Sequence, residues 1–169
     1  MTAFVALLRA VNVGGTGKLP MSELKAMCED AGFDDVRTYI ASGNVVFSSK
    51  KSEAQVRAAI EKRLHAHAGK PVAVHVRTAA EMSAVAAANP FPKAAPNRVI
   101  AIFIEAAPPA DALASITGCT DEIVKLGRRE IYVCYGEGMA HSKLKIPAAS
   151  AGTARNMNTV AKLAEMAAG

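Results

Sequence analysis

The chain has 169 residues, of which 51% are hydrophobic and 21% are charged, enough for one domain or two small, closely packed halves. No apolar run approaches the ~18 residues of a membrane span, and the start of the chain lacks a signal-peptide pattern, so we expect a cytoplasmic protein without a membrane segment. The net charge of +5 suits phosphate-bearing partners, although many proteins without a nucleic-acid role share it. The three cysteines are widely separated and odd in number, which favours reduced, buried thiols.

The first part of the chain predicts the element order of a ferredoxin-like fold. Residues 4–8 are apolar at every position, which is typical of a strand covered on both faces. The following helix, two strands, helix and strand are expected at residues 21–31, 35–41, 44–49, 52–68 and 72–77. The resulting order is strand, helix, strand, strand, helix, strand, which is the ferredoxin-like order.

A connecting segment at residues 79–96 is expected between two halves of the chain. It begins with a short alanine-rich helix and continues with three prolines, which exclude regular structure there. The second half is expected to contain a strand, a short helix, a hairpin, a loop and a closing helix at residues 98–105, 110–117, 121–135, 136–150 and 153–167. We therefore predict an α+β fold with two ferredoxin-like (βαββαβ-type) halves, residues 1–78 and 97–169. Both sheets are expected to be antiparallel, and the second half to be one strand short, so incomplete or elaborated.

The segment after the first strand carries the sharpest functional signal. Arg9 and Asn12 lead into a loop that contains Gly14 and Gly15, and Lys18 ends this loop just before the first helix. Backbone N–H groups of a glycine loop at a helix N-terminus form a natural cradle for an anion. The sequence therefore predicts a binding site here, and it does not indicate a reaction.

The glycine loop matches neither of the common nucleotide-binding patterns. A Walker A motif requires Ser or Thr after its lysine, where this chain has Leu19, and a glycine where it has Asn12. A dinucleotide-binding pattern requires a third glycine at position 20, which is Pro20. The alternative is that the glycines only turn the chain from strand to helix. Against it, Arg9 ends an apolar run and is expected to need an internal carboxylate or a ligand as its partner.

A second polar cluster is predicted on the closing helix. Arg155, Asn158, Thr159 and Lys162 have the spacing i, i+3, i+4 and i+7, which places them on one stripe of a helix. A solvated stripe is the simple alternative. Asn and Thr are mediocre helix formers, however, so their presence favours a role in hydrogen bonding.

The remaining polar groups give weaker signals. His141, Ser142 and Lys143 could be read as a catalytic pair, but nothing in the sequence sets their geometry, and Lys143 is better interpreted as an anion contact. His65 and His67 lie on different faces of their helix, and no cysteine pair has metal-ligand spacing, so we expect no metal site and no cofactor. Aromatic residues are too sparse for a platform that stacks single-stranded nucleic acid.

Several segments of the chain carry a resemblance to a known family. They are Ala6–Gly15, Met21–Leu24, Arg37–Phe47, Asn89–Phe91, Ser142–Leu144 and Thr153–Thr159. In combination these motifs resemble the bacterial family of domain of unknown function 1697, and the resemblance spans nearly the whole chain. It implies an α+β fold with no established activity. Two positions depart from the usual pattern, since Ala10 stands where glycine is common and Met157 where tryptophan is common.

The polar positions of these motifs suggest one composite site. We expect a basic polar cleft that binds an anionic ligand: a nucleotide, a phosphorylated metabolite or a nucleic-acid backbone. The residues expected to bind it are Arg9, Asn12, Gly14, Gly15, Lys18, Ser42, Asn44, Lys143, Arg155, Asn158, Thr159 and Lys162. In particular, Arg9 and the stripe that begins with Arg155 are expected to face the same cleft.

Two other classes of function stay open at this point. A small hydrolase or transferase could use the same pocket, although no carboxylate, histidine or cysteine of the motifs is an evident general base or nucleophile. A protein-interaction module without a small-molecule site is the other alternative. The sequence does not predict the oligomeric state.

Overall fold

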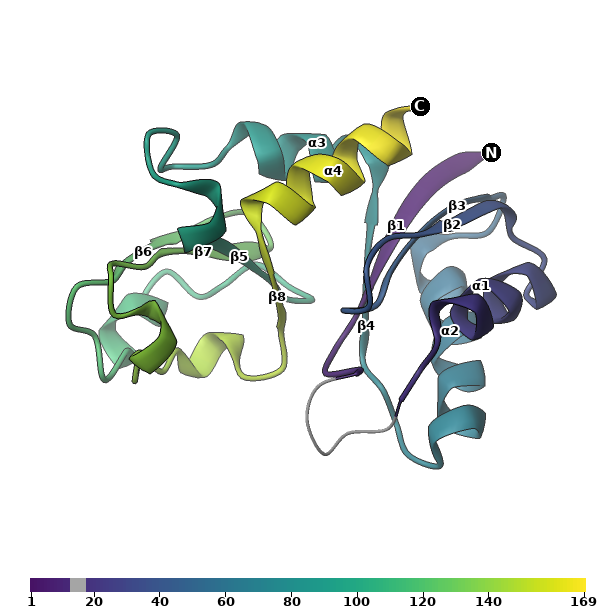
Figure 1. Ribbon diagram of the computed structural model, residues 1–169, viewed down its shortest axis with the longest axis horizontal. Helices are drawn as coiled ribbons and strands as arrows, with labels where there is room; N and C mark the ends of the chain where they lie inside the picture. The colour runs from purple at the N-terminus through teal and green to yellow at the C-terminus, as the bar shows by residue number, and fades with distance from the viewer. Residues whose placement is uncertain (13–17) are drawn as a thin grey trace. The chain divides into compact units, whose positions relative to one another are not determined.

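The computed structural model describes residues 1–12 and 18–169. The chain divides into two compact units: unit 1 comprises Met1–Ser83 together with Leu163–Gly169, and unit 2 comprises Ala84–Lys162. Each unit contains one four-stranded sheet (Figure 1). None of the helices in the described ranges has the length and apolar character that a membrane crossing needs.

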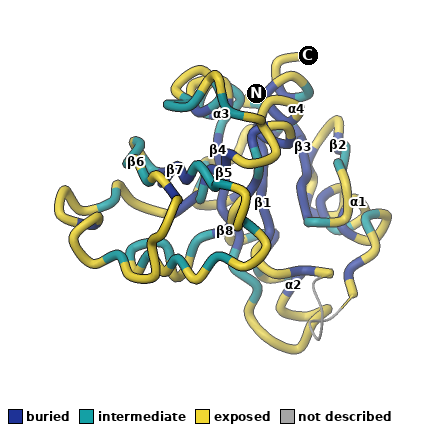
Figure 2. The backbone as a smooth tube through the Cα atoms, turned by 60° about the vertical axis from the view of Figure 1, so that its left-hand side comes forward, coloured by how far each residue is buried: buried dark blue, intermediate teal, exposed yellow. Residues whose placement is uncertain are grey.

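Unit 1 has the predicted ferredoxin-like order. Its elements are β1 (Thr2–Leu8), α1 (Met21–Asp30), β2 (Asp34–Thr38), β3 (Asn44–Ser49), α2 (Glu53–Ala68) and β4 (Val74–Thr78). The strands form sheet A in the order β2-β3-β1-β4, and every neighbouring pair is antiparallel. The two central strands, β1 and β3, are buried along most of their length (Figure 2). The prediction that both faces of the first strand are covered is therefore confirmed.

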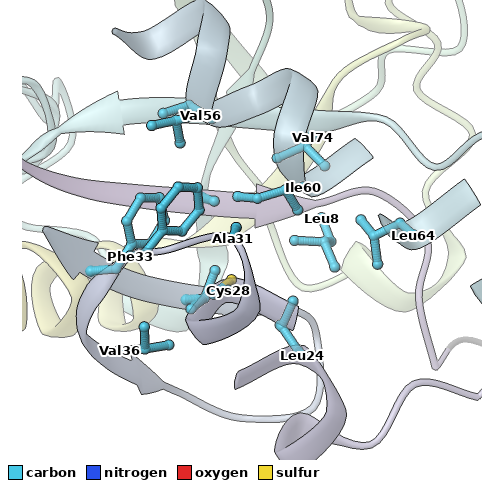
Figure 3. Packing of buried hydrophobic residues seen from close by; sticks show 14 of the residues in the cluster. Leu8, Leu24, Cys28, Ala31, Phe33, Val36, Val56, Ile60, Leu64 and Val74 are labelled. Atoms are coloured by element: carbon cyan, nitrogen blue, oxygen red, sulfur yellow. The ribbon is translucent and has the colours of Figure 1, made fainter. Parts of the chain in front are cut away.

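The core of unit 1 lies between sheet A and its two helices. Successive side chains of a strand point to opposite faces, so Leu8 and every second residue before it point to the same face. Figure 3 shows Leu8 of β1 close to Leu24 of α1 and to Ile60 and Leu64 of α2, all of them almost fully buried. The helical spacing of these residues gives each helix one apolar face, and this face packs on the sheet.

The ends of the helices in unit 1 are set by recognisable capping residues. Ser52 and Gln55 form a capping box at the start of α2, and Gly69, with a φ of 72°, ends the helix in the left-handed conformation.

The C-terminal segment Leu163–Gly169 belongs to this unit, where Arg37 Nη1 donates a hydrogen bond of 2.9 Å to the carbonyl of Met166. A cation at the last turn of a helix is favourable because it offsets the negative end of the helix dipole.

Unit 2 contains a second sheet with the same strand order. Its strands are β5 (Val99–Phe103), β6 (Ile123–Leu126), β7 (Glu130–Cys134) and β8 (Thr153–Asn156), and they form sheet B in the order β6-β7-β5-β8. All three neighbouring pairs are antiparallel. The connections contain only short 3-10 helices, at Pro96–Arg98, Ala112–Ser115, Met139–His141 and Pro147–Ala149. The α+β class and the two antiparallel sheets are therefore confirmed.

The second half differs from its prediction in three places. The predicted lack of a fourth strand is wrong, because residues 153–156 pair with β5 and form β8. The closing helix, α4 (Met157–Ala168), therefore starts later than predicted, and Asn156 caps it by accepting a hydrogen bond of 3.0 Å from the N–H of Thr159. The helix predicted at residues 110–117 is only the 3-10 helix Ala112–Ser115. A four-residue strand is too short to give a clear period-two signal beside a helical pattern.

A helix follows the fourth strand in both sheets. After β4, Thr78 and Glu81 form the predicted capping box of α3 (Ala79–Ala87), with bonds of 2.9 Å and 3.1 Å between side chain and backbone. After β8, Asn156 caps α4. The divisions between unit 1 and unit 2 fall inside these two helices, after Ser83 and after Lys162.

Candidate functional site

Asn12 fixes the base of the glycine loop. Its amide nitrogen donates hydrogen bonds of 2.8 Å to the carbonyls of Leu19 and Ala41, and its amide oxygen accepts one of 2.6 Å from the N–H of Leu19. Both amide hydrogens are therefore used by the protein itself. Asn12 joins the two ends of the loop and ties them to the turn between β2 and β3. Gly14 and Gly15 lie outside the described residues.

The turn between β2 and β3 is fixed by a second asparagine. Asn44 is fully buried, and its amide nitrogen donates bonds of 2.8 Å to the carbonyl of Tyr39 and to the hydroxyl of Ser42. Gly43 has a φ of 89°, and a Cβ at this position would lie only 2.7 Å from Cγ2 of Val11. Asn44 and Ser42, predicted as ligand contacts, thus have a structural role in holding this turn against the end of β1.

Unfavourable backbone conformations gather at this end of sheet A. Ala10, Asn12 and Ile40 have φ values of 56°, 54° and 50°, which L-residues other than Asn and Asp rarely adopt. Ile40 is β-branched and 50% exposed, so its conformation is not explained by packing of its own side chain. Such residues persist only where the surroundings over-determine the backbone, and they cluster at functional sites. Here the hydrogen bonds of Asn12 and Asn44 hold the backbone in these conformations.

A cavity of about 170 Å³ opens beside the base of the glycine loop. Its wall comes from four segments: the residues after β1, the lead into α1, the last turns of α2 and the lead into β4. The lining residues are Ala10, Val11, Lys18, Leu19, Leu64, His67, Ala68, Lys70 and Val72. The wall is thus mainly apolar, with the basic residues Lys18, His67 and Lys70 among its members.

His67 connects the cavity wall to both helices of unit 1. Its Nε2 lies 3.4 Å from the carbonyl of Lys18, and its Nδ1 lies 3.4 Å from a carboxylate oxygen of Glu23 in α1. Both partners are acceptors, so only the doubly protonated imidazolium can donate to both of them. This contact with Glu23 places a carboxylate beside the cavity wall.

The net charge around the cavity is positive. Lys18 and Lys70 are exposed and belong to the wall. The C-terminal end of α2 contributes a partial negative charge of about half an elementary charge, and the N-terminal end of α1 a similar positive one. These helix ends offset each other, so the charges of the two lysines dominate.

The chain shares its sequence pattern with one family over residues 1–132, described as "Protein of unknown function (DUF1697)". It belongs to this family. Among solved structures it is similar to the conserved bacterial protein SP0830 from Streptococcus pneumoniae, with 25% sequence identity, a TM-score of 0.81 and coverage of 98% of each chain. A comparison with curated proteins finds no match. Family membership therefore supports the fold and leaves the activity to be argued from the site.

The predicted stripe on the closing helix of this DUF1697 protein is wrong. Arg155 lies in β8 and is buried, and its Nη1 donates to Oγ1 of Thr153 at 2.7 Å and to the carbonyl of Ala154 at 2.9 Å. Burial lowers the pKa of Arg155 to about 10. Thr159 is also buried in α4, whereas Asn158 and Lys162 are exposed. These four residues therefore do not share one accessible face.

Arg9 also has a different environment from the one expected. It is exposed and follows β1, and its backbone N–H donates a bond of 3.0 Å to the carbonyl of Ala73. The predicted need for a partner assumed burial of its charge, and this assumption is wrong. Arg9 belongs to unit 1 and Arg155 to unit 2, so their position in a common cleft stays a prediction.

Ser142 of the family motif is bound to a carboxylate that the sequence analysis missed. Glu122 is buried, accepts a hydrogen bond from the hydroxyl of Ser142, and accepts bonds of 2.8 Å and 3.1 Å from the N–H and hydroxyl of Thr120. These bonds, that of Ser142 foremost, lower the pKa of Glu122 to about 2. Such a weak base is unsuited to activating a serine nucleophile near neutral pH, so the pair is structural. The adjacent Lys143 is exposed.

The three cysteines are free, as predicted. Their environments differ from the prediction, since Cys28 is buried, Cys134 is half-buried and Cys119 is exposed. Burial raises the pKa of Cys28 to about 12, which makes this thiol unreactive near neutral pH. In the part of the chain that the structure describes, no group of three or more His, Cys, Asp or Glu residues could hold a metal ion.

Proposed function

We propose that this DUF1697 protein binds a small anionic metabolite, such as a phosphorylated one, in the cavity beside the glycine loop of unit 1. The observation that carries the proposal is the combination of a mainly apolar wall with Lys18 and Lys70. Binding sites for small molecules typically combine apolar walls with a few placed polar groups. Lys18 and Lys70 would contact the anionic group, and the apolar wall would contact the remainder of the ligand.

The size of the cavity favours a small ligand. Sites for drug-sized molecules commonly have volumes of about 300–1,000 Å³. The cavity of about 170 Å³ is smaller, so it suits a phosphate or carboxylate group with a short carbon chain better than a whole nucleotide. A nucleic-acid backbone would need a groove with a longer row of cations than these two lysines supply.

The side-chain contacts that hold the backbone around the cavity in place support the same proposal. Asn12 joins Leu19, in the cavity wall, to the turn after β2, and His67 contacts the carbonyl of Lys18. A site that is held in place before the ligand arrives loses less conformational freedom on binding. In this proposal Asn12 and His67 position the site, and the lysines contact the ligand.

Binding is favoured over catalysis for a chemical reason. Among the described residues of the cavity wall, His67 is the one side chain that commonly exchanges protons near neutral pH. Both of its nitrogens already face acceptors, namely the carbonyl of Lys18 and the carboxylate of Glu23. A general base needs a nitrogen that is free to accept a proton from the substrate.

Thermal denaturation in the presence of anions tests the proposal. The probes are phosphate, pyrophosphate, short-chain phosphate monoesters and short-chain carboxylates, each compared with chloride at equal ionic strength. A bound ligand stabilises the folded protein by about 2.7 kcal/mol at a concentration of 100 times Kd, so the wild type should show a clear rise in Tm with at least one probe. The rise should fall strongly in Lys18→Met and Lys70→Met.

The control variant is Lys25→Met, which removes an exposed lysine of α1 outside the cavity and should keep the full rise in Tm. An equal rise in the cavity variants would contradict the proposed site. No rise with any probe would contradict the proposal itself. A short oligonucleotide that binds with a steep dependence on salt would instead favour the nucleic-acid alternative.

A further inference from the structure

Strand β6 is an edge strand of sheet B. It pairs with β7 alone, with Ile123 opposite Cys134 and Leu126 opposite Ile131. The hairpin continues with a hydrogen bond of 2.7 Å from the N–H of Gly127 to the carbonyl of Glu130. In the part of the chain that the structure describes, no second strand lies on the other side of β6.

The hydrogen-bonding pattern shows which residues of β6 point outward. In an antiparallel pair, residues alternate between bonding to the partner strand and pointing away from it. Because Gly127 bonds to Glu130, the alternation makes Lys125 and Ile123 bond to β7 as well. The backbone N–H and C=O groups of Val124 and Leu126 therefore point outward.

This edge has less protection than the corresponding edge of sheet A: it is short and carries the exposed Lys125, but it has no bulge. Strand β2 is the matching edge strand, and it carries an irregularity in register between Asp34 and Arg37, with Asp35 at a φ of 51°. Bulges and charged residues of this kind prevent an edge from pairing with another chain. Strand β6 pairs with β7 in a regular register, and Ile123 is 52% exposed.

We propose that β6 pairs antiparallel with β6 of a second copy of this chain, which joins two sheets B into one continuous sheet. The two β6 strands would be related by a two-fold axis perpendicular to the sheet. Residues that lie opposite each other across this axis have their side chains on the same face of the sheet. With the axis at Val124, its outward N–H and C=O groups bond to Val124 of the second copy. Ile123 then lies opposite Lys125 of the second copy, and by symmetry Lys125 lies opposite Ile123 of the second copy.

Charge complementarity selects this partner and this register. The segment has acidic residues before β6, Asp121 and Glu122, and basic residues after it, Arg128 and Arg129. With the axis at Val124, antiparallel pairing places Asp121 opposite Gly127 of the second copy and diagonal to Lys125 of the second copy on the same face, twice in the dimer; both side chains are exposed. A shift of the axis to Lys125 would place two lysines directly opposite each other, which is destabilising.

The expected dimer is weak. Four residues per strand bury a small area, well below the ~1,200 Å² that specific, stable interfaces usually exceed. The contact of Ile123 with the aliphatic part of Lys125 of the second copy supplies its apolar component. We therefore expect a dimer that forms with rising protein concentration. This inference does not depend on the proposed anion site, which lies in unit 1.

Sedimentation equilibrium over a wide range of protein concentration tests the proposal, with a matched pair of variants. Ile123→Lys places a lysine opposite Lys125 of the second copy and should weaken dimerisation about tenfold, since cross-strand pairs differ by up to ~1 kcal/mol and occur twice. Ile123→Glu removes the same apolar side chain but creates opposite charges, so it should dimerise at least as well as the wild type at low salt. Ile123 is exposed, so neither substitution should affect folding.

A third variant tests the backbone bonds directly. Val124→Pro removes an N–H that points away from β7, and edge strands tolerate proline at such positions. It should abolish dimerisation while circular dichroism shows a folded protein. If it unfolds, the pair of Ile123 variants still decides the question. A wild type that stays monomeric at all concentrations, or equal weakening by Ile123→Lys and Ile123→Glu, would overturn the proposal.

Discussion

Sheet A and sheet B have the same strand order, but different structures connect their strands. In sheet A, two full helices, α1 and α2, connect the strands and bury an apolar core on one face. In sheet B, the equivalent connections are long loops with one 3-10 helix between β5 and β6 and two between β7 and β8. The strand order therefore does not depend on helices in the connections. It requires only that each connection is long enough to bring its strands into the same antiparallel arrangement.

The two units also differ in how their connections are held. In unit 1 the helices are held by buried apolar side chains such as Leu24 and Ile60. In unit 2 the loops are held by polar groups, with the carboxylate of Glu122 bound to Thr120 and Ser142, and Thr117 paired with Lys145. Apolar packing should be largely insensitive to pH, whereas a bound carboxylate should not be. Three predictions follow this contrast, from the largest effect to the smallest.

Leu24→Ala should give the largest loss of stability. Leu24 is fully buried between α1 and sheet A, and truncation of such a residue lowers the free energy of unfolding by about 2–5 kcal/mol. Urea denaturation monitored by circular dichroism measures this change. The control is Leu113→Ala in the 3-10 helix of unit 2, where the side chain is 44% exposed and the change should stay within about 0.5 kcal/mol. Similar losses for both variants would contradict the contrast between the units.

Much of unit 1 could be predicted from the sequence, because its signals are local. The apolar run of β1, the capping box at Ser52 and Gln55, and the glycine after α2 lie next to the elements that they set. The partners that give unit 2 its loops are distant in the chain. Glu122 and Ser142 are 20 positions apart, so no local pattern connects them. For the same reason the sequence did not reveal that Arg155 lies in a strand that pairs with β5.

The proposed site overlaps in part with the residues predicted from the sequence. The sequence identified the loop between β1 and α1 and its Lys18, which does line a cavity. It missed Lys70 and did not assign His67 to a site, because they reach the cavity from the end of α2, some 50 positions along the chain. It also interpreted Asn12 and Asn44 as ligand contacts, since a sequence does not distinguish an amide that binds a ligand from one that binds the backbone. Only the geometry separates these roles.

Glu122→Gln should change how the stability of unit 2 depends on pH. The folded-state pKa of Glu122 is lowered from 4.5 to about 2, so its contribution to stability is fully present above pH 4.5 and is lost as the pH falls towards 2. The Tm of the wild type should therefore fall between these values more steeply than that of the variant. Above pH 4.5 the variant should have the lower Tm. Parallel Tm curves for the two proteins across this range would contradict the structural role of Glu122.

Ala10→Gly should give the smallest effect, and it should be stabilising. Ala10 has a φ of 56°, a conformation that costs an L-residue about 1–2 kcal/mol, while glycine loses about 0.5–1 kcal/mol in chain entropy. The net gain in the free energy of unfolding is about 0.5–1 kcal/mol. The matched control is Ala26→Gly in α1, an exposed helical position where the same change should destabilise by about 1 kcal/mol. Urea denaturation should show opposite signs for the two variants, and the same sign in both would contradict backbone strain at Ala10.

The central claim, that the cavity of unit 1 binds small anions, is tested most directly by an NMR titration that locates the binding site. Two-dimensional ¹H–¹⁵N spectra of the wild type are recorded while pyrophosphate is added at constant ionic strength. We predict saturable shift changes at the amides of Leu19, His67 and Lys70, which line the cavity, and a loss of these changes in Lys18→Met. Shift changes that do not saturate, or that cluster on sheet B instead, would contradict the account.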